Sequence, residues 1–130
     1  MRRVKIYIFL LPLFYFQIII GQKSSLSLNI LGTIQDGGSP HIGCNKKCCK
    51  LLSQEEKNKR LVSSLGLVDI ENDKFFLFDA TPDIEKQIRL LNKNFKKELK
   101  LEGIFLTHAH MGHYSGLMYL GKEALGANRV

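Results

Sequence analysis

The sequence predicts an α/β fold, because strand patterns and helical patterns follow one another in the order strand, loop, hairpin, helix, strand and helix. Residues 25–33 alternate apolar and polar side chains, which is typical of a half-buried strand. Residues 84–95 instead carry apolar side chains at helical spacing. A length of 130 residues leaves room for no more than one small domain.

Residues 1–22 are expected to be a signal peptide that precedes this domain. A basic head is followed by the uncharged apolar run of residues 6–21, and polar residues come next. This order is typical of a secretory signal. The run is shorter than the roughly 20 apolar residues of a membrane-spanning helix, and Pro12 interrupts it. We therefore expect an exported protein, periplasmic or secreted, with an uncleaved N-terminal membrane anchor as the competing interpretation.

The formal net charge of +7 does not predict nucleic-acid binding. The basic residues of the head belong to the signal segment, and much of the remaining positive charge lies in residues 46–60 and 93–100. Neither segment is interleaved with aromatic side chains as a nucleic-acid-binding face is. We interpret both as solvated surface, expect no nucleic-acid partner, and expect membrane contact only through the signal segment.

A loop, a short helix and a β-hairpin are expected after the first strand. Residues 32–44 are rich in glycine and predict the loop. Residues 46–58 are charged and predict a short exposed helix. The apolar runs of residues 61–70 and 74–80, joined by a short polar segment, predict the hairpin.

The clearest boundary in the sequence is the start of the next helix. Thr81 can cap this helix, and Pro82 suits its first turn. Asp83 and Glu85 carry negative charge near the positive end of the helix dipole. A helix is therefore predicted from Thr81 to the lysine-rich segment that follows residue 92.

A buried strand over residues 101–107 and a final helix from Tyr114 complete the predicted order. The helix would place three apolar side chains on one face: Leu117, Leu120 and Ala124. Gly126 provides a natural stop. The segment between strand and helix, residues 108–113, is predicted to be a loop.

That loop carries three of the four histidines of the chain, His108, His110 and His113. Alternate side chains of an extended segment share a face, so His108 and His110 can point the same way, while His113 approaches from another direction. Neutral imidazole is a favoured ligand of zinc and iron, and the carboxyl end of a strand is the usual place of an α/β active site. The spacing indicates a metal site, with a surface cluster of histidines as the alternative.

Three segments of the chain together resemble the metallo-β-lactamase superfamily. The stretch "THAHMGH" is similar to the H-x-H-x-D-H signature, and "FFLFDATPDI" resembles the apolar strand that ends in an aspartate, here Asp79. The stretch "LNILGTIQDGGSPHIGCNKKCC" resembles the branch that contains the pyrroloquinoline quinone synthesis protein B and phosphoribosyl cyclic phosphodiesterase. The resemblance implies that residues 23–130 form the N-terminal half of an αβ/βα sandwich, a mixed sheet with flanking helices.

The resemblance also implies roles for individual residues. His108 and His110 would bind a first metal ion and His113 a second, with Zn²⁺ as the expected ion and Fe²⁺ as the alternative. Asp79 would support the site, since such carboxylates orient imidazole ligands by accepting their ring N–H. His113 and Asp79 are therefore the candidate catalytic residues.

Asp36 and His41 are candidate contacts to a small-molecule substrate. Both lie in the glycine-rich loop, where glycine allows the backbone to approach a ligand closely. For His41, a surface role or a role in supporting the nearby cysteines is the alternative.

The sequence departs from the superfamily pattern at Gly112 and in its length. At the position of Gly112 the superfamily has an aspartate that binds the second metal ion, and glycine has no side chain for this task. We therefore expect the second metal site to be weak or absent. The remaining ligands of the family come from its second half, so the 130-residue chain is expected to be truncated and inactive by itself.

The chemistry of Cys44, Cys48 and Cys49 stays open in the sequence. Three neighbouring cysteines leave one unpaired if a disulfide forms, but they also suit a metal when a fourth ligand comes from elsewhere. The resemblance implies a structural zinc knuckle, with Cys48 replacing a middle cysteine. The alternatives are a disulfide between Cys44 and either neighbour, or free thiols, because bridge geometry disfavours a bond between Cys48 and Cys49.

Taken with the resemblance, these features predict an exported metal-dependent hydrolase in which a metal-bound water attacks an ester or phosphodiester. An iron-dependent oxidase or hydroxylase, like the quinone-synthesis relatives, is the first alternative. An inactive metal-binding fragment is the second alternative. The sequence leaves the oligomeric state open.

Overall fold

The structure is a computed structural model that describes residues 25–123 and 126. The predicted signal segment, residues 1–22, and Ala124 lie outside these described residues. In the part of the chain that is described, no helix combines the length and the apolar character that crossing a membrane requires.

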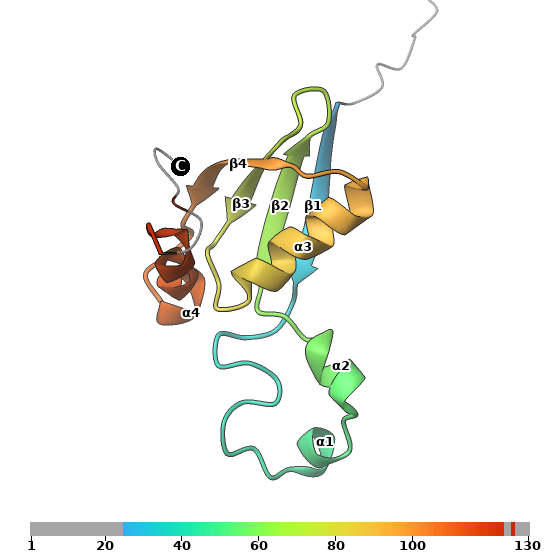
Figure 1. Cartoon of the computed structure of the whole chain (residues 1–130). Helices are drawn as coiled ribbons and strands as arrows, with labels where there is room; N and C mark the ends of the chain where they lie inside the picture. The colour runs from blue at the N-terminus through green and yellow to red at the C-terminus, as the bar shows by residue number, and fades with distance from the viewer. Residues whose placement is uncertain (1–24, 124–125, 127–130) are drawn as a thin grey trace, which may run out of the picture.

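A four-stranded sheet in the order β1-β2-β3-β4 forms the centre of the described chain (Figure 1). Its strands are β1 (Leu26–Gly32), β2 (Ser64–Asp69), β3 (Lys74–Phe78) and β4 (Lys100–Phe105). The first three strands pair antiparallel, whereas β3 and β4 pair parallel. The predicted α/β class with a mixed sheet is confirmed.

The predicted hairpin is formed by β2 and β3, which are joined by a turn closed by Asp69. The Asp69 carboxylate accepts hydrogen bonds from the backbone N–H of Asn72, at 3.2 Å, and from its side-chain amide, at 2.7 Å. Short polar side chains of this kind stabilise turns by bonding to nearby groups. The register then pairs Leu67 with Phe76, and the apolar alternation of both strands is aligned.

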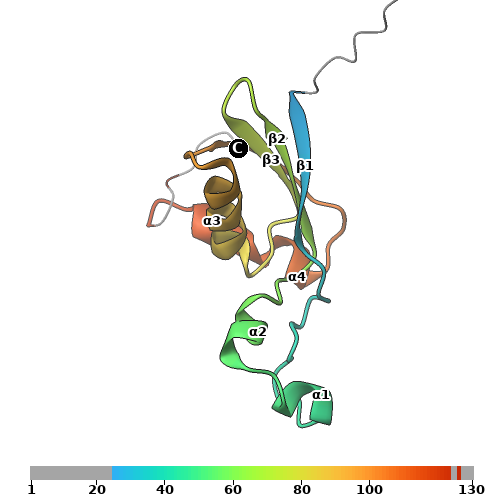
Figure 2. The ribbon, with the colours of Figure 1, turned by 90° about the vertical axis from the view of Figure 1, so that its right-hand side faces the viewer.

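Helix α3 (Ile84–Phe95) covers one face of the sheet, as Figure 2 shows edge-on. It begins later than predicted, at Ile84, with Asp83 and not Thr81 as the N-cap residue, because Pro82 and Asp83 form a turn before the helix. The Thr81 hydroxyl accepts a hydrogen bond from the Asp83 N–H of this turn at 3.1 Å and lies 2.9 Å from the side-chain oxygen of Gln87. Leu91 is fully buried and packs over Gly66, where an added Cβ would lie 2.9 Å from a Leu91 methyl carbon. Glycine at position 66 therefore lets the helix approach the sheet.

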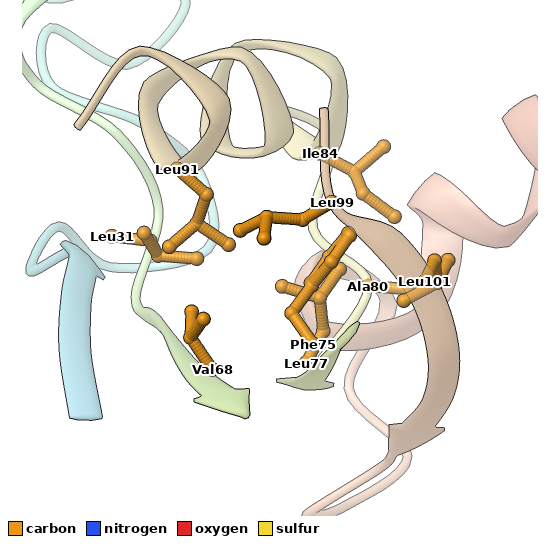
Figure 3. Close-up of a cluster of buried hydrophobic side chains, with 9 residues drawn as sticks. All are labelled: Leu31, Val68, Phe75, Leu77, Ala80, Ile84, Leu91, Leu99 and Leu101. Carbon is orange, nitrogen blue, oxygen red and sulfur yellow. The ribbon is translucent and has the colours of Figure 1, made fainter. Parts of the chain in front are cut away.

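The core lies between α3 and the sheet (Figure 3). Its buried side chains are those of Leu31, Val68, Phe75, Leu77, Ala80, Ile84, Leu91, Leu99 and Leu101. They come from all four strands, their flanks and the helix, so this core fixes the positions of the strand ends.

Two predicted elements differ from the structure in extent or burial. The single helix expected over residues 46–58 is wrong, because two short helices form instead, α1 (Lys47–Lys50) and α2 (Gln54–Asn58). Ser53 separates them by capping α2 in a reciprocal capping box with Glu56. The last strand is also less buried than expected, since β4 lies at the edge of the sheet.

The last predicted helix starts earlier and has a different type. Helix α4 (Met111–Tyr114) is followed by a 3₁₀ helix, η1 (Ser115–Leu120). The Gly116 N–H donates to the Ala80 carbonyl at 2.8 Å, and the Ala80 N–H donates to the His113 carbonyl at 2.8 Å. These bonds tie the segment to the end of β3 and use backbone groups that a continuous α-helix would pair internally.

The sheet face opposite α3 is apolar and exposed along β1. Leu28 and Ile30 are 63% and 69% exposed, whereas Leu31 on the other face is 2% exposed. Exposed apolar surface on a sheet face marks a candidate interaction site.

We expect the double substitution Leu28→Lys and Ile30→Lys to reduce binding of an apolar fluorescent dye. The free energy of unfolding should change by no more than about 1 kcal/mol, because these side chains pack little in the described chain. Urea unfolding and dye titration measure the two effects, and Leu31→Lys serves as the buried control that should prevent folding. A destabilisation by the double substitution as large as that of the control would show that this face is covered in solution.

Candidate metal centre

The candidate site lies where β3 and β4 end side by side. Asp79 follows β3 directly, and Thr107 and His108 follow β4. Parallel strands bring their carboxyl ends to the same edge of a sheet, which is where ligands bind in α/β folds. Helix α4, which carries His113, is attached to this edge by the hydrogen bond between the Ala80 N–H and the His113 carbonyl.

Asp79 is the structural centre of the site. Its side chain is buried, and its backbone has a positive φ of 70°. The carboxylate accepts the Thr107 N–H at 2.8 Å, and the Thr107 hydroxyl lies 2.9 and 2.8 Å from its two oxygens. It also contacts His113 Nδ1 at 2.8 Å. One carboxylate therefore holds together the end of β3, the end of β4 and helix α4.

The electrostatics of the site favour an ionised Asp79. Desolvation raises the pKa of Asp79, but the hydrogen bonds from the Thr107 N–H, from His113 and from the Thr107 hydroxyl outweigh it and hold this pKa below its usual value. The hydrogen bond to Asp79 raises the pKa of His113; desolvation opposes this rise and Asp36 reinforces it. An ionised carboxylate only accepts hydrogen bonds, so His113 carries a proton on Nδ1.

Thr107 extends the same network to His108. Because the Thr107 hydroxyl donates to Asp79, it accepts a hydrogen bond from the Nδ1–H of His108, at 2.9 Å. The Nδ1 atoms of His108 and His113 are thus both engaged on the Asp79 side, and each ring presents Nε2 on its other side. For His108 this arrangement selects the tautomer whose Nε2 lone pair can bind a metal ion. The Nε2 of His113 lies 3.1 Å from the Asp36 carboxylate, to which it donates, so it can bind an ion only after it loses that proton.

The structure brings the three predicted histidines together. The ring centroids of His108 and His113 lie 4.0 Å apart, and those of His108 and His110 lie 4.6 Å apart. His108 Nε2 is 3.1 Å from His110 Nδ1. His108 and His110 are exposed, whereas His113 is buried.

Asp36 joins this cluster from the loop that follows β1. Its Oδ1 lies 3.1 Å from His113 Nε2, and its Oδ2 lies 3.9 Å from His110 Nδ1. Desolvation raises the pKa of Asp36, but hydrogen bonds from a backbone N–H and from His113 outweigh it and lower this pKa below its usual value. The sequence suggested Asp36 as a substrate contact, and the structure places it directly against two candidate ligands.

The donor set fits a divalent metal ion. Imidazole nitrogens and carboxylate oxygens are the ligands that zinc takes in catalytic sites. Within residues 25–123 and 126, no three side chains of the ligating types are already arranged around an ion position. The donor atoms instead face one another, as His108 Nε2 faces His110 and His113 Nε2 faces Asp36.

His41 is not brought to this cluster. Its Nδ1 lies 2.9 Å from the carbonyl oxygen of Ile42, and its side chain is exposed. No contact between His41 and the three histidines is seen in the described part of the chain. Thr107, in contrast, was missed by the sequence reasoning, although its place directly before His108 could have indicated it.

The cysteines differ from the predicted zinc knuckle. Cys44 and Cys49 form a disulfide, and Cys48 is a free, exposed cysteine. A sulfur bonded in a disulfide is not a thiolate, and the thiolate is the form that binds metal. Of the alternatives in the sequence, the disulfide between Cys44 and a neighbour is the one present, and in this form Cys44 and Cys49 offer no thiolate to the structural Zn²⁺ that the resemblance implied.

The fold and the clustered side chains define an α/β protein with a histidine-rich candidate metal centre at the ends of parallel strands. A family model described as the metallo-beta-lactamase superfamily matches residues 59–124. The chain belongs to this superfamily, as the resemblance of its motifs predicted.

Curated relatives place the chain near the predicted branch. It is 24% identical over 108 residues to Coenzyme PQQ synthesis protein B of Rhizobium meliloti (strain 1021), covering 80% of this chain and 36% of the relative. It is 31% identical over 88 residues to an octanoyltransferase of Porphyromonas gingivalis (strain ATCC BAA-308 / W83), covering 68% of this chain and 16% of the relative. The chain therefore spans about a third or less of the length of these relatives.

Solved structures agree with this placement. A new diphosphatase from the PhnP family matches with a TM-score of 0.54 and 31% identity, over 73% of this chain and 34% of that chain. Zn(2+)-bound PqqB from Methylobacterium extorquens matches with a TM-score of 0.57 and 25% identity, over 73% of this chain and 36% of that chain. The described sheet and helices are thus part of a metallo-β-lactamase fold, and the predicted branch is confirmed.

Proposed function

We propose that this chain supplies the first group of ligands in a metal-dependent hydrolase that acts on an ester or phosphodiester of a small molecule. The observation that carries the proposal is the convergence of three imidazoles and Asp36 around the edge where β3 and β4 end. The similarity to a zinc-bound relative and to a diphosphatase supports it. Export through residues 1–22 is part of the proposal, and detection of the mature chain outside the cytoplasm tests it.

In this proposal each residue of the site would have its own role. His108 and His110 hold a first ion, and His113 belongs to a second. Asp79 fixes His113 by accepting its Nδ1–H, and Thr107 fixes both Asp79 and His108. A bound divalent ion lowers the pKa of water and polarises the oxygen of a scissile ester. Groups held by such a network need little reorganisation when substrate arrives.

Metal binding tests this assignment directly. We expect His108→Ala and His110→Ala each to weaken Zn²⁺ binding by more than about 100-fold, because losing a ligand costs more than losing a partner that only orients it. His113→Ala should weaken Zn²⁺ binding at the first site, which His108 and His110 form, by a smaller factor. Isothermal titration with Zn²⁺ measures the affinities, and His41→Ala is the matched control because its ring lies outside the cluster. Equal losses for all four variants would contradict the assignment.

An iron-dependent oxidase or hydroxylase is the second candidate function. The similarity to Coenzyme PQQ synthesis protein B favours it, and the same imidazoles suit iron. The two functions differ in their requirements. Oxygen consumption with Fe²⁺ and no turnover with Zn²⁺ would favour the oxidase, whereas hydrolysis of a model phosphodiester with Zn²⁺ would favour the hydrolase. Metal binding without either activity would favour a non-catalytic role.

A further inference from the structure

Asp36 occupies the place that the missing side chain of residue 112 would take. We propose that Asp36 supplies the carboxylate ligand of the second metal position, beside His113. It would thereby replace the aspartate that the superfamily has at the position of Gly112. This inference rests on the proposed function, because it concerns the ligands of the same centre.

The first argument is steric. A Cβ added to Gly112 would lie 2.4 Å from Asp36 Cβ, 2.8 Å from its Cα and 2.9 Å from its Cγ. Real Cβ atoms do not approach other atoms so closely, because the interior is packed at van der Waals distances. The Asp36 side chain therefore fills the volume that a side chain at position 112 would need, and the two are mutually exclusive.

The second argument is the direction of the carboxylate. Asp36 Oδ1 lies 3.1 Å from His113 Nε2, which is the nitrogen that Asp79 leaves available, and Oδ2 lies 3.9 Å from His110. The side chain is 39% exposed, so it also faces solvent. A carboxylate that faces both a ligand nitrogen and solvent can bind an ion that enters from solvent.

The third argument is that Asp79 is already saturated. Both of its oxygens accept hydrogen bonds from Thr107 or His113, and its side chain is 7% exposed. Asp36 is the other carboxylate that contacts the imidazoles in the described chain. Asp36 can therefore bind an ion while Asp79 keeps the hydrogen bonds that hold the site together.

The backbone around Asp36 holds this position. The Ile34 N–H donates to the Leu61 carbonyl at 3.0 Å, and the Ser63 N–H donates to the Ile34 carbonyl at 2.8 Å. On the other side, the Gln35 side chain accepts from the Gly37 N–H at 2.9 Å and donates to the Gly38 carbonyl at 2.7 Å. The loop is thus anchored before and after Asp36, which limits the entropy lost when the carboxylate binds an ion.

Titration of the chain with Co²⁺, followed by absorption and by native mass spectrometry, tests the proposal. We expect the wild-type chain to bind a second Co²⁺. Asp36→Asn should lower the affinity for this second ion by at least about 10-fold, while the first ion is still bound. His113→Ala should have a similar effect, and the double variant should not be additive. Asp73→Asn is the matched control, since this exposed aspartate lies in the turn between β2 and β3.

A second variant at the same position separates ligand loss from misfolding. Asp36→Ala should lose the second Co²⁺ and keep the first, because it removes the carboxylate but retains the Cβ that lies against Gly112. Unfolding in EDTA verifies that each variant folds. Unchanged binding of the second Co²⁺ by Asp36→Asn or by Asp36→Ala would overturn the inference alone. A wild-type chain that binds no Co²⁺ would overturn the proposed function with it.

Discussion

Replacement of Asp79 by alanine is expected to lower the free energy of unfolding by about 3–5 kcal/mol, the usual result of removing one partner of a buried charged pair. The substitution leaves the Thr107 N–H and His113 Nδ1 without their acceptor. It also places alanine at a positive φ of 70°, which aspartate and asparagine adopt more readily than alanine does. Urea unfolding in EDTA measures the loss without a contribution from bound metal.

Asp79→Asn is the matched control for this prediction. Asparagine keeps the size of the side chain and adopts positive φ more readily than other residues. It still accepts hydrogen bonds through its oxygen but has no charge, so its destabilisation should be clearly smaller than that of alanine. If Asp79→Ala lowers stability by less than about 1 kcal/mol, the carboxylate does not organise the site as we infer.

The second large effect is expected for Gly116→Ala. An added Cβ would lie 2.1 Å from the Thr81 carbonyl oxygen and 2.9 Å from the Ala80 carbonyl carbon and oxygen. These neighbours are backbone atoms next to the core, so they cannot move aside without shifting β3 or α3. Overpacking typically costs about 1–3 kcal/mol, and the hydrogen bond from Gly116 to Ala80 would be lost as well.

The Gly116 substitution should also reduce metal binding, because it pushes α4 and His113 away from Asp79. Gly121→Ala is the control, since an added Cβ there would lie 3.4 Å from the flexible Glu123 side chain. Urea unfolding and Co²⁺ titration of both variants give the comparison. Similar behaviour of the two alanine variants would mean that the close approach at Gly116 does not position the histidines.

Elements governed by local patterns were predicted well from the sequence. The β2–β3 hairpin needs only two apolar strands and a polar turn, and Asp69 closes that turn through its neighbour Asn72. The start of α3 was predicted to within one turn, because the Thr81 hydroxyl and the Asp83 N–H that shape the preceding turn are near each other in the chain. Because the partners of such contacts are adjacent in the chain, the sequence contains all the information that they require.

Features that depend on distant partners were predicted less well. The final helix is shortened by hydrogen bonds to Ala80, which no helical pattern reveals. The edge position of β4 depends on strand order, so its exposure could not follow from its apolar composition. The cysteines are a different case: Cys44 and Cys49 are near each other in the chain, but the sequence allowed several states, and the local structure that leads into α1 brought these two within bonding distance.

The residues of the candidate metal centre also fall into those that the sequence identified and those that only the structure brought together. The sequence by itself determined the histidines, because their spacing and the strand before them are local, and it identified Asp79 through its motif. Only the tertiary structure decided that Asp36 meets His113, since these residues are 77 positions apart. The physical reason is that the place of Asp36 depends on long-range backbone contacts, such as that between Ile34 and Leu61. No periodicity in the sequence encodes a contact of that kind.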